Sequence, residues 1–258
     1  MGASAVPTGQ GSEEGMAEIW IGTSGYVYRH WRGGEFYPPG LPARDELTWY
    51  ATRFRTVELN NPFYRPPSPD TWARWAAAVP DDFLFAVKVT RVVSHYRRLR
   101  GAGEPLARFL EQAGALGSKL GPLLVQLPPQ FHLDQVALDA FLADLPTSFR
   151  WVLEVRHPSW QVPEVYRALA ARGVALCVPV GGAVQPDLVT TARFTYLRMH
   201  RGLGEGGRFS DEELATWARR VGAVARSGKD AYVYFNNDRG GHAPRDAQRL
   251  CQLLRLER

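Results

Sequence analysis

The chain has 258 residues and 45% hydrophobic content, enough to bury a sizeable core in one large α/β domain or in two small ones. Its net charge of +5 comes almost wholly from arginine, since only three of 31 basic residues are lysine, and the arginines are scattered, which permits an anionic ligand and does not favour nucleic acid. No apolar run approaches the ~20 residues of a membrane helix and the N-terminus lacks a signal-peptide pattern, so we expect a cytoplasmic protein with no membrane partner.

Short apolar runs alternate with amphipathic stretches along most of the chain. We expect residues 1–16 to be a disordered tail and residues 17–258 to form one domain. The alternation is typical of parallel strands joined by helical crossovers. It predicts eight strands, at residues 19–23, 55–60, 83–89, 123–127, 150–156, 174–178, 194–200 and 231–236.

Helix signals follow most of these strands. Ser68 and Pro69 predict an N-cap and a first turn, and Ser210 with Glu213 predicts a capping box. The weakest unit is 181–192, which offers a short helix or none. Eight strand–helix units in roughly 240 residues match a single (β/α)8 TIM-type barrel, for which about 250 residues is typical. The competing open doubly wound sheet is disfavoured, because no GxGxxG turn follows the first strand.

Polar side chains recur on one face of the predicted strands, near their carboxyl ends. In a barrel this face points to the axis and the apolar face packs on the helices. The polar set on this face is Glu58, Asn60, Lys88, Gln126, Glu154, Arg156, Arg198, His200 and Asn236, and the following loops add Tyr64, Arg65, His95 and His157. We expect one site there, although a self-neutralised layer of acids and bases that plugs the barrel is the structural alternative.

Residue chemistry divides this set into two roles. We expect the basic, amide and loop residues to bind a ligand: Lys88, Arg156, Arg198, Gln126, Asn236, Asn60, His95, Arg65 and Tyr64. We expect the acids and two histidines to be catalytic: Glu58, Glu154, His157 and His200. Together they favour an acid/base enzyme, a hydrolase or isomerase, acting on a small phosphate- or carboxylate-bearing ligand.

Two other functions stay open. One is a metal-assisted phosphodiesterase acting on nucleic acid, and the other is a non-catalytic barrel that binds an anion. No cofactor is predicted. A divalent metal stays open because the four predicted catalytic residues could meet at the barrel mouth, although no HExxH motif or close histidine pair supports it. The oligomeric state is undetermined.

Several ungapped stretches resemble the domain of unknown function 72 (YecE-like) family, over Ile19 to about Leu254. They are GTSGY, TVELNNPFYR, FAVKVTR, LGPLLVQLPPQF, LEVRHPSW, YLRMH and YVYFNND. The resemblance implies a TIM-type barrel and no established activity. It implies motif positions at Glu58, Lys88, His95, Gln126, Glu154, Arg156, His157, Arg198, His200 and Asn236. The chain departs from the family pattern at Val178–Pro179, where an acid is common, at Arg201, and at Asp246, where asparagine is usual.

Overall fold

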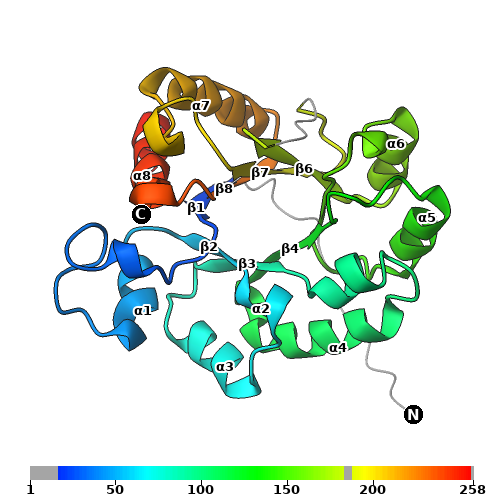
Figure 1. Ribbon diagram of the computed structural model, residues 1–258, viewed down its shortest axis with the longest axis horizontal. Coiled ribbons are helices and arrows are strands. Elements are labelled where there is room, and N and C mark those ends of the chain that lie inside the picture. The colour runs from blue at the N-terminus through cyan, green and yellow to red at the C-terminus, as the bar shows by residue number, and fades with distance from the viewer. Residues whose placement is uncertain (1–16, 183–187, 257–258) are drawn as a thin grey trace, which may run out of the picture.

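The computed structural model describes residues 17–182 and 188–256 (Figure 1). Residues 1–16, which we expected to be a disordered tail, lie outside the described residues. Within them, eight parallel strands form one sheet. The strands are β1 (Ile19–Thr23), β2 (Thr56–Leu59), β3 (Leu84–Lys88), β4 (Leu120–Gln126), β5 (Trp151–Glu154), β6 (Ala175–Val180), β7 (Phe194–Met199) and β8 (Asp230–Phe235).

The sheet curls into a nearly closed barrel. Its strand order is β1-β8-β7-β6-β5-β4-β3-β2, so each strand lies beside its neighbour in sequence and β8 returns to β1. The two ends of the sheet meet at a bridge between Ser24 and Glu58, where Gly25 N donates to Glu58 O at 2.8 Å. A Cβ atom on Gly22 would collide with the carbonyl oxygen of Thr56. Glycine at this position therefore lets β1 approach β2.

Helices surround the strands on the outside of the barrel (Figure 1). They are α1 (Glu46–Tyr50), α2 (Asn61–Tyr64), α3 (Pro69–Ala77), α4 (Gly103–Ala113), α5 (Gln135–Asp144), α6 (Pro163–Ala171), α7 (Asp211–Arg226) and α8 (His242–Leu254). Ser68 caps α3, and Ser210 and Glu213 form both halves of the capping box of α7, which confirms those predictions. The expected weak unit after β6 shows no helix in its described residues, 181–182 and 188–192. The predicted (β/α)8 barrel is confirmed.

Two apolar layers flank the sheet. Outward side chains such as Val57, Leu153 and Leu197 pack in the core that the helices cover. Inward side chains fill the barrel itself, and they are Trp20, Ala86, Leu124, Val152, Ala175, Cys177, Phe194, Tyr196, Tyr232 and Tyr234. Because side chains alternate along a strand, Glu154 faces inward two residues after Val152. The apolar filling therefore ends where the polar residues begin.

Strand β5 ends at Glu154, two residues before the predicted end. The neighbouring strand β4 ends at Gln126. The last backbone hydrogen bond between the two strands runs from Leu127 N to Glu154 O at 2.9 Å, so the pairing of β5 stops at Glu154. Arg156 therefore lies in the loop, where it is exposed. No helix among the described residues combines the length and the apolar character needed to cross a membrane.

Candidate functional site

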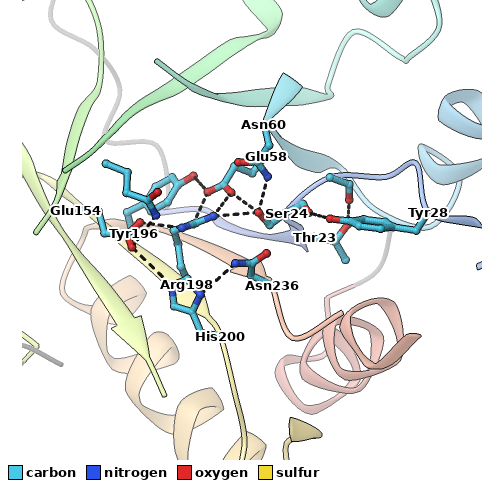
Figure 2. Close-up of polar contacts among 12 residues, drawn as sticks. Thr23, Ser24, Tyr28, Glu58, Asn60, Glu154, Tyr196, Arg198, His200 and Asn236 are labelled. Atoms are coloured by element: carbon cyan, nitrogen blue, oxygen red, sulfur yellow. Dashed lines mark hydrogen bonds and ion pairs between the residues drawn. The ribbon is translucent and has the colours of Figure 1, made fainter. Parts of the chain in front are cut away.

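Arg198, on the inner face of β7, is the centre of the polar end of the barrel (Figure 2). Its guanidinium donates two hydrogen bonds to Glu58, from Nε to Oε2 at 3.0 Å and from Nη2 to Oε1 at 2.8 Å. Its Nη1 donates to Glu154 Oε2 at 2.9 Å. The three residues are almost fully buried, at 2%, 0% and 1% exposure for Arg198, Glu58 and Glu154. One guanidinium therefore joins two buried carboxylates, from β2 and β5.

Further donors complete the shell of Glu58. The Ser24 hydroxyl donates to Oε1 through a short bond, and the Tyr196 hydroxyl donates to Oε2 at 2.7 Å. Asn60 Nδ2 and Arg198 Nη2 donate to Ser24 Oγ at 2.7 and 3.1 Å. A carboxylate offers about four acceptor positions, and four side-chain hydrogen bonds occupy them here. Glu58 is thus suited to holding Arg198 in place rather than to exchanging a proton with a ligand.

Tyr196 belongs to this cluster although our sequence analysis did not single it out. The side chain lies two residues before Arg198 on β7, on the same inward face. The alternation of inward and outward side chains every two residues was therefore the sequence signal that could have placed Tyr196 beside Arg198. A tyrosine among apolar neighbours is also typical of an ordinary barrel filling, so the sequence did not distinguish the two roles.

Glu154 contacts one amide, Gln126, and one histidine, His200, and a second amide, Asn236, contacts that histidine. Gln126 Nε2 donates to Glu154 Oε1 at 3.0 Å. His200 Nε2 lies 3.7 Å from the same oxygen, too far for a good hydrogen bond, so the attraction is chiefly electrostatic. Asn236 Nδ2 lies 3.1 Å from His200 Nδ1. With the amide assigned as donor, Nδ1 accepts, so the proton of a neutral His200 sits on Nε2 and faces Glu154.

The buried carboxylates stay ionised because of Arg198. Burial raises the pKa of Glu58, but the charge and hydrogen bonds of Arg198, together with the hydrogen bonds of Ser24 and Tyr196, lower it by more. Burial likewise raises the pKa of Glu154, and Arg198 and His200 together bring it well below the usual range of a glutamate. Both side chains are therefore carboxylates at neutral pH. In this state they can accept a proton but cannot donate one.

Lys88 and Arg156, two basic residues at the barrel mouth, have no carboxylate bonded to them among the described residues. The Lys88 side chain forms no hydrogen bond or ion pair with any described residue, and its Nζ lies 3.8 Å from the ring centre of Phe63. Arg156 likewise has no bonded partner among them, and its charge acts on both Lys88 and His95. Burial, then Lys88 and Arg156, lower the pKa of His95. This part of the barrel mouth carries uncompensated positive charge.

A pocket of about 250 Å³ opens beside the buried cluster. It is lined by Pro129, Glu154, Val155, Arg156, Pro179, Gly182 and His200. Glu154 is the one carboxylate among these lining residues. Pro179 lines the wall at the end of β6, where the resemblance implied an acid in other members. The pocket therefore combines one ionised acid, one histidine and one free guanidinium.

Larger hollows lie elsewhere on the described surface but carry different chemistry. One of about 620 Å³ is lined by Tyr64, Arg65 and residues of the α2–α3 connection, and another of about 500 Å³ lies at the amino-terminal end of the strands. Neither is lined by a histidine, and only the second includes an acid, Asp230. Size alone does not select the site. We select the pocket of about 250 Å³ because its lining combines an acid, a histidine and a guanidinium.

The structure does not bring all the predicted site residues into this pocket. His157 caps the short helix Pro158–Trp160, accepting from Ser159 N at 3.2 Å, and its ring lies 3.8 Å from that of His132. Arg65 lines the separate hollow described above. Tyr64 is 62% exposed, with its ring centre 6.0 Å from Lys88 Nζ. Because these residues follow strand ends in the sequence, they were predicted to lie near the barrel mouth. The sequence could not predict the direction in which their side chains point.

The divalent metal left open by the sequence would require Glu58, Glu154, His157 and His200 to meet, and this meeting is not seen. Arg198 lies between Glu58 and Glu154, and His157 is turned to His132. Within residues 17–182 and 188–256, no group of three or more His, Cys, Asp or Glu is arranged to hold a metal ion. The geometry of the described side chains thus gives the metal hypothesis no support.

The model of one family, described as protein of unknown function DUF72, matches residues 20–258. The chain belongs to the DUF72 family. The relationship predicted from the sequence is thereby confirmed. DUF72 carries no assigned activity in that description, so the chemistry of this member has to be argued from its own residues.

Relatives of this DUF72 protein include UPF0759 protein YecE of Escherichia coli (strain K12), 32% identical over 150 residues, which are 56% of this chain and 54% of the relative. The match thus spans about half the length of that relative. UPF0759 protein YunF of Bacillus subtilis (strain 168) is 26% identical and the match covers 93% of this chain and 95% of that one. A crystal structure of a DUF72 protein from Thermotoga maritima is 28% identical with a TM-score of 0.81, covering 92% of this chain and 99% of that chain. The fold is that of the family.

Proposed function

We propose that this DUF72 protein is an acid/base enzyme that acts on a small ligand carrying a phosphate or carboxylate group, at the carboxyl end of the barrel. The proposal is supported by the difference between paired and unpaired cations at the barrel mouth. Arg198 is occupied by Glu58 and Glu154, whereas Arg156 and Lys88 have no anionic partner among the described residues. Arg156 lines the pocket, and Lys88, which does not line it, interacts electrostatically with Arg156 and Glu154. Cations without an anionic partner at such a site favour a ligand of opposite charge.

The roles divide between binding and chemistry. Arg156 and Lys88 hold the anionic group, and Arg198 positions the two carboxylates rather than touching the ligand. Glu154 accepts a proton, with His200 beside it as the partner that takes or returns the proton. Gln126 and Asn236 orient these two side chains. The 3.7 Å gap between His200 Nε2 and Glu154 Oε1 leaves both groups free to bond a ligand atom.

Binding is tested with inorganic phosphate as the probe, titrated by calorimetry. Arg156→Gln and Lys88→Met should each weaken the affinity about 10-fold or more, because a hydrogen bond to a charged group contributes ~1.5–3 kcal/mol. Arg167→Gln is the matched control, since Arg167 is exposed on α6 and bonds Glu164. Equal affinities for all four proteins would remove the binding part of the proposal.

Catalysis is tested with Glu154→Gln, which removes the charge and keeps the shape. We expect the variant to bind phosphate and to lose turnover, measured against a panel of phosphorylated and carboxylated metabolites that includes any anion that copurifies. Glu111→Gln, on the exposed face of α4, is the control. Turnover unchanged in Glu154→Gln would refute the role of Glu154.

A non-catalytic anion-binding barrel is the second candidate. The observation that favours it is the complete hydrogen bonding of Glu58, which fits a structural layer as well as an active site. A wild-type protein that binds phosphate and turns over nothing in the panel would select this candidate. The cytoplasmic location stays a prediction from the sequence.

A further inference from the structure

Lys88 differs from an ordinary buried lysine. It lies at the carboxyl end of β3 with 5% of its surface exposed, and its ammonium faces the ring of Phe63. Lys119 shows the usual arrangement, because its Nζ donates to Ala76 O and Val79 O at 2.8 Å and pairs with Asp81 at 3.2 Å. Lys88 has no such acceptor among the described residues. Both glutamates that could have paired with it are bound to Arg198.

The surroundings of Lys88 favour the uncharged amine. Burial lowers its pKa to about 8, and Arg198 and Arg156 contribute in the same direction against Glu58 and Glu154. An amine that is dehydrated and placed beside other cations is the kind of lysine that reacts with carbonyl groups. A lysine serving only as a permanent cation would be better placed against a carboxylate.

We propose that Lys88 is a nucleophile that forms an imine with the carbonyl group of an oxo acid whose acidic group is held by Arg156. The inference rests on the proposed function and narrows it, since it adds a carbonyl group to the anionic ligand. The ring of Phe63 covers the amine on one side, with its centre 3.8 Å from Nζ. Glu154 and His200 line the pocket together with Arg156, and the charges of Glu154 and Arg156 both act on Lys88.

The reaction is balanced without an oxidant or reductant. The Nζ lone pair attacks the carbonyl carbon, the electrons of the C–O π bond move to oxygen, and a proton passes from nitrogen to oxygen to give a carbinolamine. The hydroxyl then leaves as water after receiving a proton, the nitrogen forms a double bond to carbon as a protonated imine, and loss of its N–H proton gives back the proton that was supplied. One amine and one carbonyl give one imine and one water. His200 lines the pocket, and its imidazolium form can supply the first proton and take back the second.

The imine is trapped by reduction. The full chain is incubated with pyruvate and sodium cyanoborohydride at pH 8, and the modified sites are located by peptide mass mapping. The chain contains only Lys88, Lys119 and Lys229, so Lys229 serves as an internal control. At pH 8 about half of an amine of pKa 8 is uncharged, against under ~1% for a lysine of ordinary pKa. We expect at least ~10-fold faster labelling at Lys88 than at Lys229.

Two comparisons test the oxo-acid part. Arg156→Gln should slow labelling of Lys88 by pyruvate, and acetone, which lacks the carboxylate, should label Lys88 more slowly than pyruvate. Lys88→Arg should abolish the adduct at this position, because a guanidinium forms no imine under these conditions, and should leave labelling of Lys229 unchanged. Labelling at Lys88 that is insensitive to Arg156 and equal for acetone and pyruvate would overturn the oxo-acid assignment.

Failure of this inference can be told apart from failure of the proposed function. Labelling at Lys88 no faster than at Lys229, in a protein that binds phosphate through Arg156, overturns the imine and leaves the anion site standing. Slow labelling together with no phosphate binding overturns both. Because the ratio of Lys88 to Lys229 is measured in the wild-type protein, the result does not depend on any variant folding.

Discussion

Replacing Arg198 with methionine tests the central cluster most directly. The substitution removes both hydrogen bonds to Glu58, the bond to Glu154 and the bond to Ser24. It leaves two carboxylates buried without their cation. Breaking a buried pair by removing one partner costs about 3–5 kcal/mol, and domains are typically stable by only ~5–15 kcal/mol. We therefore expect Arg198→Met to lose about 3–5 kcal/mol of unfolding free energy at neutral pH.

The loss should depend on pH in a defined direction. In the wild-type protein the pKa values of Glu58 and Glu154 are depressed, so their contribution is present above the unfolded value of ~4.3 and is lost as pH falls through the folded values. Without Arg198, burial dominates and the folded pKa values lie above the unfolded one. That contribution is present at low pH and is lost as pH rises. The stability deficit of Arg198→Met therefore grows between pH 5 and pH 7.5.

The assay is urea unfolding followed by tryptophan fluorescence at pH 5 and pH 7.5. Arg167→Met is the control, since it removes an exposed pair with Glu164 and should cost under ~1 kcal/mol. Adding Glu58→Gln and Glu154→Gln to Arg198→Met should recover part of the loss, because no buried charge is then uncompensated. A deficit below ~1 kcal/mol at pH 7.5, or the same deficit at both pH values, would refute the reasoning.

Three further variants test other parts of the structure by the same unfolding assay. Gly22→Ala places a Cβ against Thr56 O at the barrel closure and should cost about 3 kcal/mol or prevent soluble expression; a neutral effect would mean that β1 and β2 do not approach as described. Ser210→Ala removes half of the capping box of α7 and should cost about 1 kcal/mol, whereas no change would show that Glu213 alone satisfies the helix start. His157→Ala should cost about 1 kcal/mol through its lost cap and leave phosphate affinity unchanged, and weaker phosphate binding would return His157 to the site.

Sequence alone determined the strands, most of the helices and the barrel. Hydrophobic residues repeat every two positions in a strand and every 3.6 positions in a helix, and caps such as Ser68 and Ser210 mark helix starts. All of these signals depend on residues close together in the chain. The inward face was also readable, because side chains alternate along a strand. Glu58, Glu154 and Arg198 could therefore be assigned to one end of one barrel before any contact between them was known.

Only the tertiary structure decided which of these charges pair. Glu58 and Arg198 are 140 positions apart in sequence, and no local pattern encodes the distance between them. Once Arg198 binds both carboxylates, Arg156 and Lys88 are left without partners and become the candidate ligand-binding cations. Pairing depends on ångström-scale separations across the barrel, which the curvature of the sheet sets and the alternation of residue types does not.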